Sequence, residues 1–107
     1  MTKTAREYFA AMPAAFSPRA ATGLSATYQF ELSGEGGGSW FVRIHDGEVE
    51  VGEGREPAPD VVLRASAHDY VAIAEGRASP TLALATGRFK IGGSVRLAMK
   101  LTKLFPR

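Results

Sequence analysis

The residues that could carry acid–base or metal chemistry are few in this chain. It holds two histidines, His45 and His68, and no cysteine. The histidines fall in different predicted elements, and neither has a second histidine or a cysteine near it, so we expect no metal site. His45 precedes Asp46, but neighbouring residues of a strand point to opposite faces of a sheet. We therefore expect no catalytic dyad from this pair.

The glycine-rich segment 34–38 is a second candidate, because loops of this kind can hold a phosphate group. It reads Gly-Glu-Gly-Gly-Gly and is followed by Ser39, so it does not complete the pattern G-x-G-x-x-G. It also precedes a predicted strand rather than a helix, whose N-terminal amides would bind the phosphate. A hairpin loop is the better interpretation, and no G-x-S-x-G segment offers an activated serine. The sequence therefore predicts no catalytic residue, no metal and no cofactor, and a protein that is not an enzyme.

Apolar periodicity and turn residues predict the elements that must position any binding site. Alternating apolar and polar residues predict strands over 26–32, 40–44, 48–51, 61–65 and 88–91. Helical spacing predicts helices over 4–12, 66–74, 79–86 and 95–105, with Ser66, Ser79 and Ser94 as the capping residues of the last three. Pro13 is expected to end or kink the first helix, Asp46-Gly47 to form a hairpin, and Gly92-Gly93 to form a turn. This order predicts an α+β fold, with a five-stranded, mainly antiparallel sheet and the helices stacked on one face.

Length and composition predict one globular domain over residues 1–107. A chain of 107 residues can bury one core, and its 45% of apolar residues and 22% of charged residues differ from a disordered chain. No segment approaches the roughly 20 apolar residues that span a bilayer. Arg6 and Glu7 interrupt the N-terminal segment before it reaches signal-peptide length. Since the chain has no cysteine, it suits a reducing compartment, and we expect a cytoplasmic protein.

Charge is distributed unevenly along the chain, although the net charge is only +2. Eight acidic residues lie between Glu31 and Asp60, and six basic residues with no acidic residue follow Thr86. The basic end could meet an anionic membrane, nucleic acid or the acidic half of the protein, or it could simply be solvated. Nucleic acid is disfavoured, because the basic residues lack interleaved aromatics and a binding motif. The candidates for membrane docking are Lys90, Arg96, Lys100 and Lys103.

Segment 87–101 carries the most specific motif in the sequence. Residues 87–93 read G-R-F-K-I-G-G and residues 97–101 read L-A-M-K-L. Upstream, an apolar strand, a glycine-rich turn and a strand opening with tryptophan follow one another between Phe30 and Ile44. This order resembles the sterol carrier protein type 2 family of small lipid-binding domains, whose motifs are G-K-L-K-I-x-G and L-A-x-K-L. The chain departs from the family at Leu84, where an aromatic residue is frequent, and at Ser94, where Asp or Asn is usual.

The resemblance implies an apolar tunnel between the sheet and the helices, covered by the C-terminal helix. Its expected ligand-binding residues are Phe30, Trp40, Leu84, Phe89, Ile91, Met99, Leu101 and Phe105. The same residues would also suit an ordinary core, and the sequence alone does not separate the two cases.

The function that the resemblance implies is non-enzymatic binding of a lipid or other hydrophobic ligand such as a fatty acid, an acyl-CoA or a sterol-like molecule. Transfer between membranes would extend that function, with transient contact at an anionic membrane surface and the protein as a monomer or weak homodimer. An alternative is an interaction module that supports a lipid-metabolising enzyme. A third hypothesis, an enzyme acting on a bound hydrophobic acid, is disfavoured by the missing catalytic residues.

Overall fold

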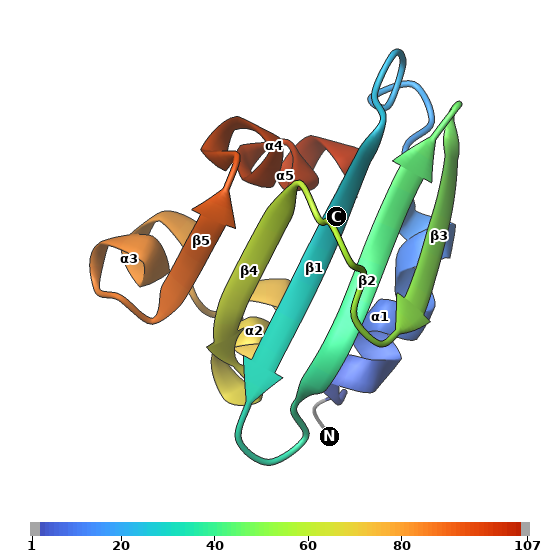
Figure 1. Ribbon diagram of the computed structural model, residues 1–107. Coiled ribbons are helices and arrows are strands. Elements are labelled where there is room, and N and C mark those ends of the chain that lie inside the picture. Colours follow the sequence, from blue (N-terminus) through green and yellow to red (C-terminus); the bar gives the residue numbers. More distant parts are fainter. Residues whose placement is uncertain (1–2, 106–107) are drawn as a thin grey trace.

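A five-stranded sheet organises the chain, of which the computed structural model describes residues 3–105 (Figure 1). The strands are β1 (Ala26–Ser33), β2 (Gly38–His45), β3 (Glu48–Glu53), β4 (Val61–Ser66) and β5 (Phe89–Gly93). The helices are α1 (Ala5–Ala15), α2 (Ala67–Ala74), α3 (Pro80–Ala85), α4 (Val95–Met99) and α5 (Leu101–Leu104). The sheet order is β3-β2-β1-β4-β5, with β1 and β4 parallel and the other neighbouring pairs antiparallel. The predicted α+β class and mainly antiparallel sheet are confirmed.

The helices cover one face of the sheet, and the opposite face carries only the connection from β3 to β4 (Figure 1). Because successive strand residues alternate between faces, β1 sends Tyr28 and Phe30 toward the helices and Gln29 and Glu31 toward the open face. Tyr28 and Phe30 are almost completely buried. The two sides of the sheet are therefore chemically different, with an apolar covered face and a polar open face.

An aromatic stack joins α1 and α2 to the sheet. The ring of Phe9 in α1 stacks on Trp40 of β2 and on Tyr70 of α2, with ring centroids 4.7 Å and 4.9 Å apart. It also meets Phe30 of β1 edge-on at 5.0 Å. Rings in these arrangements contribute roughly 0.5–1.5 kcal/mol per pair beyond the area they bury. Phe9, which is itself 1% exposed, therefore anchors the N-terminal helix.

The predicted serine caps are confirmed. The amides of Asp69, Leu82 and Leu97 donate to the hydroxyls of Ser66, Ser79 and Ser94 at 3.0, 3.3 and 3.2 Å. Each hydroxyl satisfies one of the amides that a helix start leaves without an intrahelical acceptor. The caps therefore place the starts of α2, α3 and α4 where the sequence predicts them.

Two predicted boundaries are wrong. Helix α1 continues past Pro13 to Ala15, so of the two expectations for this proline the end of the helix is wrong. Pro13 lies in the last turn, where its fixed φ suits a helix and where few residues follow the hydrogen bond that it removes. Gly92 and Gly93 do not form the turn alone but complete β5, where they pair with Val62 and Val61. Gly93 has a φ of +85°, and a side chain at this position would meet the Asp60 carbonyl, so the turn into α4 starts there.

The predicted helix 95–105 is divided into α4 and α5 at Lys100. The Tyr28 hydroxyl donates to the Leu97 carbonyl at 2.7 Å, and the Lys100 amide also donates to this carbonyl at 3.1 Å. In a continuous α-helix the Leu101 amide would be its donor. Burial, followed by the Asp60 carboxylate, raises the pKa of Tyr28 to about 12, so the phenol keeps its proton at neutral pH. A contact with the sheet thus interrupts the helix.

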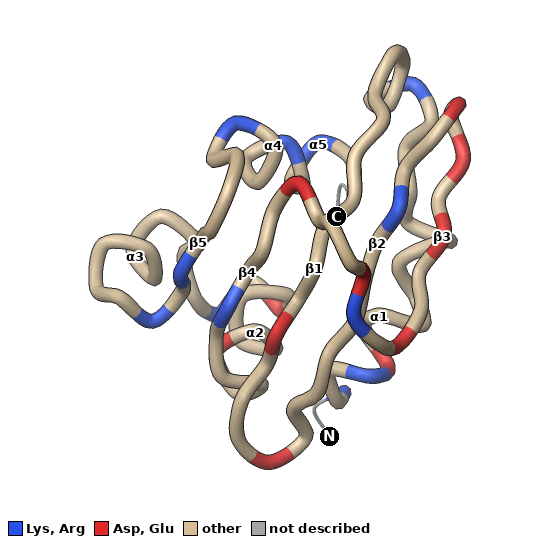
Figure 2. The backbone as a smooth tube through the Cα atoms, in the orientation of Figure 1, with Lys and Arg blue, Asp and Glu red and all other residues tan. Residues whose placement is uncertain are grey.

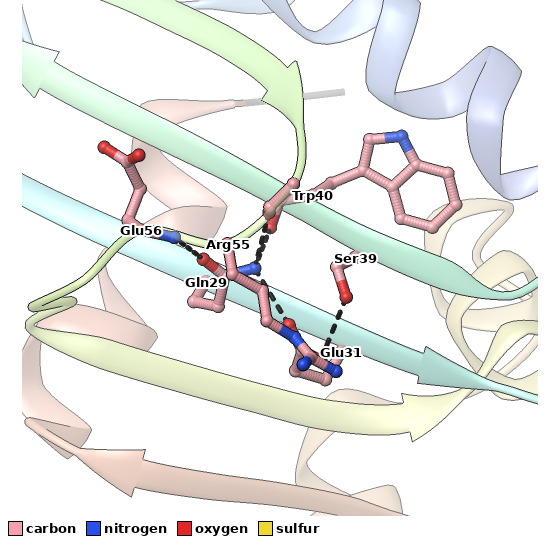
Figure 3. A network of polar contacts seen from close by, with 7 residues as sticks. Gln29, Glu31, Ser39, Trp40, Arg55 and Glu56 are labelled. Atoms are coloured by element: carbon pink, nitrogen blue, oxygen red, sulfur yellow. Dashed lines mark hydrogen bonds and ion pairs between the residues drawn. The ribbon is translucent and has the colours of Figure 1, made fainter.

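The open face of the sheet holds a hydrogen-bond network around Gln29 (Figure 3). The Gln29 side-chain amide donates to the carbonyls of Trp40 at 3.1 Å and Gly54 at 2.9 Å and to the Glu31 carboxylate at 2.9 Å. Its side-chain carbonyl accepts from the Glu56 amide at 2.8 Å. Among the described residues Gln29 is the one buried polar side chain, at 4% exposed. The network therefore ties the connection after β3 to the sheet.

Glu31 extends this network and stays ionised. Burial raises the pKa of the Glu31 carboxyl, but hydrogen bonds from Arg55, Ser39 and Gln29 outweigh that effect and leave the pKa below its ordinary value. The Arg55 guanidinium and the Ser39 hydroxyl each donate to Glu31 at 3.0 Å. Because the folded pKa is lowered, this contribution to stability is present above the ordinary pKa and is lost as the pH falls through the folded value.

The substitution Gln29→Leu should lower the free energy of unfolding by about 1–3 kcal/mol, because it removes a buried hydrogen bond to the Trp40 carbonyl and part-buried ones to Gly54 and Glu56. Urea unfolding followed by tryptophan fluorescence measures this change. Ser33→Ala is the matched control: Ser33 lies on the same strand but is exposed, and its only side-chain hydrogen bond within the described chain is a long one of 3.5 Å. Equal midpoints for the two variants would show that the Gln29 network contributes no net stability.

Candidate functional site

A cavity of about 870 Å³ lies between the covered face of the sheet and the helices. Phe30 of β1, Leu63 of β4, and Phe89 and Ile91 of β5 line its sheet side. All five helices complete the wall, through residues that include Tyr8, Met12, Tyr70, Ile73, Leu84, Ala98, Met99, Leu101 and Thr102. The cavity therefore occupies the half of the covered face around β1, β4 and β5.

The size of the cavity shows that it cannot be a sealed, empty void. At roughly 24 cal/mol per Å³, an enclosed void of this size would cost on the order of 20 kcal/mol. That exceeds the whole stability of a small domain, about 5–15 kcal/mol. The wall instead includes exposed residues, among them Met99 at 54% exposed and Thr81. Solvent or a ligand can therefore reach the space from the side of α3 and α4.

The structure brings together at the cavity all but one of the residues predicted to bind a ligand. Those in the wall are Phe30, Leu84, Phe89, Ile91, Met99, Leu101 and Phe105. The wall confirms that these side chains share one space, whereas their contact with a ligand stays a prediction. The sequence interpretation missed the contribution of α2, although Tyr70, Ile73 and Ala74 at i, i+3 and i+4 carried the signal of a helix face directed inward.

The placement of Trp40 in the cavity wall was wrong. Its indole is 4% exposed and stacks on Phe9, which in turn stacks on the cavity residue Tyr70. Trp40 is therefore covered by Phe9 and lies beside the wall residue Phe30 on the neighbouring strand, without itself lining the cavity. Strand alternation correctly predicts the face of the sheet on which Trp40 lies, but it does not show which helix residue covers it.

The wall of the cavity is uncharged. No Asp, Glu, Lys, Arg or His is present among its described residues, and its side-chain polar groups are hydroxyls. The Tyr8 hydroxyl donates to Glu75 at 2.9 Å, and the Thr102 hydroxyl donates to the Met99 carbonyl at 3.3 Å. Hydrogen bonds from Arg77 and Tyr8 hold the pKa of Glu75 below its ordinary value. The site can accommodate apolar matter, but it offers no paired acid and base and no activated nucleophile.

The cations predicted to dock at a membrane do not share one surface. Arg96, Lys100 and Lys103 are exposed on or between α4 and α5, in the basic C-terminal region of Figure 2. Lys90 points to the open face, since its neighbours Phe89 and Ile91 line the cavity, and it borders a second, polar hollow of about 560 Å³. Lys90 therefore lies on a different face from the other three, and membrane docking by any of the four stays a prediction. In the described chain, no helix is both long and apolar enough to cross a bilayer.

The histidines lie outside the cavity. His45 contacts Asp46, with 3.1 Å between Nε2 and Oδ2, so the expectation that strand geometry separates them was wrong. Asp46 is a turn residue with a φ of +52°, and the alternation of a strand does not apply to it. The Ser25 hydroxyl lies 3.4 Å from His45 Nδ1, but Ser25, His45 and Asp46 are all exposed and enclose no substrate site. Within residues 3–105 no cluster of His, Cys, Asp and Glu could hold a metal ion.

Comparison with curated proteins finds sequence relatives that are much longer than this chain. The hydroxysteroid dehydrogenase-like protein 2 of Rattus norvegicus is 46% identical over 81 residues, which are 74% of this chain and 15% of the relative. The chain therefore spans only a small part of the curated relatives that it matches.

Solved structures share the fold at lower identity. Palmitated SCP2L2 from Aedes aegypti superposes with a TM-score of 0.78 at 21% identity, over 98% of this chain and 96% of that one. The stereoselective inverting sec-alkylsulfatase Pisa1 from Pseudomonas sp. gives a TM-score of 0.82 at 16% identity, over 94% of this chain and 16% of that one. The fold thus accounts for nearly all of one protein and for one part of another.

The family itself is shown by sequence. A model of the SCP-2 sterol transfer family matches residues 9–106, which is nearly the whole chain. This range includes every strand and the complete cavity wall apart from Tyr8. The motifs in segment 87–101, the fold and the family match agree, and the chain belongs to the SCP-2 sterol transfer family.

Proposed function

We propose that this domain binds a lipid or another hydrophobic small molecule in the cavity and catalyses no reaction on it. The observation that carries the proposal is an uncharged, largely apolar wall around about 870 Å³. This volume falls within the range of roughly 300–1,000 Å³ typical of small-molecule sites. Family membership supports the proposal, as does the fold shared with an Aedes aegypti protein whose name describes it as palmitated.

The energetics favour reversible lipid binding, as in a carrier, over irreversible binding. Burial of a 16-carbon chain from water is favourable by about 13 kcal/mol, at ~0.8 kcal/mol per methylene group. A bilayer gives a chain of the same length a comparable gain, because its interior is also apolar. The net difference between protein and membrane is therefore small, and a ligand can move in either direction.

We further propose that α4 and α5 meet an anionic membrane during transfer. Val95 and Met99 lie one turn apart on α4 and are 57% and 54% exposed. The exposed cations Arg96, Lys100 and Lys103 accompany them, and each would contribute about 1 kcal/mol near an anionic surface. Met99 also lines the cavity, so the same helix would touch the membrane and border the ligand site.

An interaction module within a larger protein is the second candidate. The rat relative extends far beyond the matched region, which is only 15% of its length. A domain in that setting could deliver a ligand to a neighbouring enzyme domain or support its assembly. Ligand binding by the isolated chain favours the carrier, whereas its absence in a folded sample favours the module.

Native mass spectrometry of freshly purified protein should show one lipid-sized ligand per chain, either co-purified or after addition of palmitate or a neutral lipid. Leu84→Trp should weaken binding about ten-fold or more, because the indole occupies cavity volume that a ligand needs. The melting temperature should not fall, since the larger side chain fills open space rather than a packed core.

Leu82→Trp is the matched control for this experiment. Leu82 lies on the same helix, is 63% exposed and does not line the cavity, so the same substitution there should leave binding unchanged. If Leu84→Trp and Leu82→Trp bind lipid equally well, the ligand does not occupy this cavity.

The double substitution Lys100→Glu with Lys103→Glu should slow lipid transfer to anionic vesicles several-fold at low salt and leave affinity in solution unchanged. The exposed charges contribute little to folding, but they contribute to attraction at the membrane. The wild-type transfer rate should fall as salt rises, because salt screens exposed charges. Fluorescence dequenching of a labelled lipid measures these rates.

Arg88→Glu with Lys90→Glu is the matched control, since it changes the net charge equally but alters the open face of the sheet. This control variant should slow transfer much less than Lys100→Glu with Lys103→Glu. Equal slowing by both double variants would mean that overall charge, and not the C-terminal helices, governs the encounter.

A further inference from the structure

The aromatic stack fixes the position of Tyr70 in the cavity wall. Its ring lies parallel to Phe9, with centroids 4.9 Å apart and an interplanar angle of 3°, and it meets Phe30 edge-on at 5.8 Å. These contacts hold the ring from two elements, α1 and β1. The direction of the Tyr70 side chain is therefore set by packing rather than by its hydroxyl.

The Tyr70 hydroxyl makes no hydrogen bond within residues 3–105. In the same part of the chain, no side-chain polar atom that is fully buried lacks a partner. The hydroxyl must therefore be accessible, and Tyr70 lines the cavity. A polar group that faces an otherwise apolar space is positioned to meet a polar atom of a ligand.

Other hydroxyls of the wall are used within the protein or face bulk solvent. Tyr8 donates to Glu75, and Thr102 donates to the Met99 carbonyl. Ser79 caps α3 at its exposed start, and Thr81 is exposed beside it. Tyr70 differs from them in two ways. Its hydroxyl makes no hydrogen bond within the described residues, and the residue itself is not exposed.

The uncharged wall also limits the headgroup that can enter. A carboxylate or phosphate moved into this space would lose its hydration and meet no cation among the described lining residues. A neutral oxygen of an alcohol, an ester or a ketone loses much less hydration free energy when it leaves water. One hydrogen bond from a phenol can offset that smaller loss.

We infer that the cavity selects neutral lipids bearing an alcohol, ester or carbonyl oxygen, and that the Tyr70 hydroxyl binds this oxygen. The inference rests on the proposed function, because it identifies the ligand class of the same cavity. The phenol can serve an alcohol as donor or acceptor and an ester or ketone as donor. A long-chain alcohol, a sterol or a neutral isoprenoid fits this chemistry better than an ionised fatty acid.

The protonation state of Tyr70 agrees with this role. Burial raises the pKa of the Tyr70 hydroxyl above its ordinary value, so the phenol stays neutral through the physiological range. It therefore remains available as a donor at every pH used in the experiment below.

Three matched fluorescent probes test the inference: a pyrene-labelled decanol, the corresponding decanoate, and decylpyrene without an oxygen. At about pH 8 the alcohol should bind the wild-type protein about ten-fold or more tightly than the carboxylate, which pays for an unpaired buried charge. Lowering the pH to about 5 should reduce the difference in affinity between the alcohol and the acid, because the acid then binds in its neutral form. Binding of the alcohol and of decylpyrene should not change over this range.

Tyr70→Phe keeps the ring stack and removes only the hydroxyl. It should weaken binding of the alcohol roughly five-fold, the equivalent of one ordinary hydrogen bond, and leave decylpyrene unchanged. Thr102→Val is the matched control, because it removes a cavity hydroxyl that already has a partner in the protein. That variant should bind all three probes like the wild type.

Each outcome separates this inference from the proposed function. If the decanoate binds as tightly as the alcohol at about pH 8, its headgroup stays outside the cavity and the selection for neutral lipids is wrong. If Tyr70→Phe binds the alcohol like the wild type, the phenol is not the recognition group. If the folded protein binds none of the three probes, the proposed function itself fails.

Discussion

The stack of Trp40, Phe9 and Tyr70 is the interaction on which the arrangement of this domain depends. It fills the space between α1 and the sheet with three rings and closes that half of the covered face as a packed core. The half around β4 and β5 is covered by helices of six, five and four residues. Helices so short bury little surface each, and the space they leave against the sheet is the cavity. Core and cavity thus share the same face, with Tyr70 at their boundary.

The two faces of the sheet perform different physical tasks. On the open face, Gln29 and Glu31 hold the β3–β4 connection through hydrogen bonds that need a polar setting (Figure 3). On the covered face, Phe30 and Leu63 present only apolar surface to the cavity. Strand alternation allows β1 to serve both sides without a conflict between them. A substitution on one face can therefore be interpreted separately from the ligand site on the other.

The C-terminal segment α4–α5 is anchored to the body of the protein at its end and borders the opening of the cavity. The Ser17 amide donates to the Leu104 carbonyl at 2.8 Å, and the Leu104 side chain is fully buried, so the end of α5 is fastened to the body of the protein. Met99 and Thr102, in contrast, are exposed while lining the cavity. The break between α4 and α5 lets neighbouring turns serve these different roles. A single straight helix would present one continuous apolar face to the sheet.

The sequence by itself determined what depends on neighbouring residues. Strand alternation, the serine caps and the motif in segment 87–101 predicted the strands, the helix starts and the family, because each of these is a local property of the backbone or a linear pattern. The family resemblance predicted only part of the cavity wall, and the contributions of α1 and α2 were missed. Only the tertiary structure decided the burial of Trp40 beneath Phe9 and the break at Lys100. Both depend on contacts between residues distant in the chain, such as Tyr28 with Leu97, which are 69 positions apart. Periodicity predicts which face a side chain occupies, but packing between elements decides what it meets there.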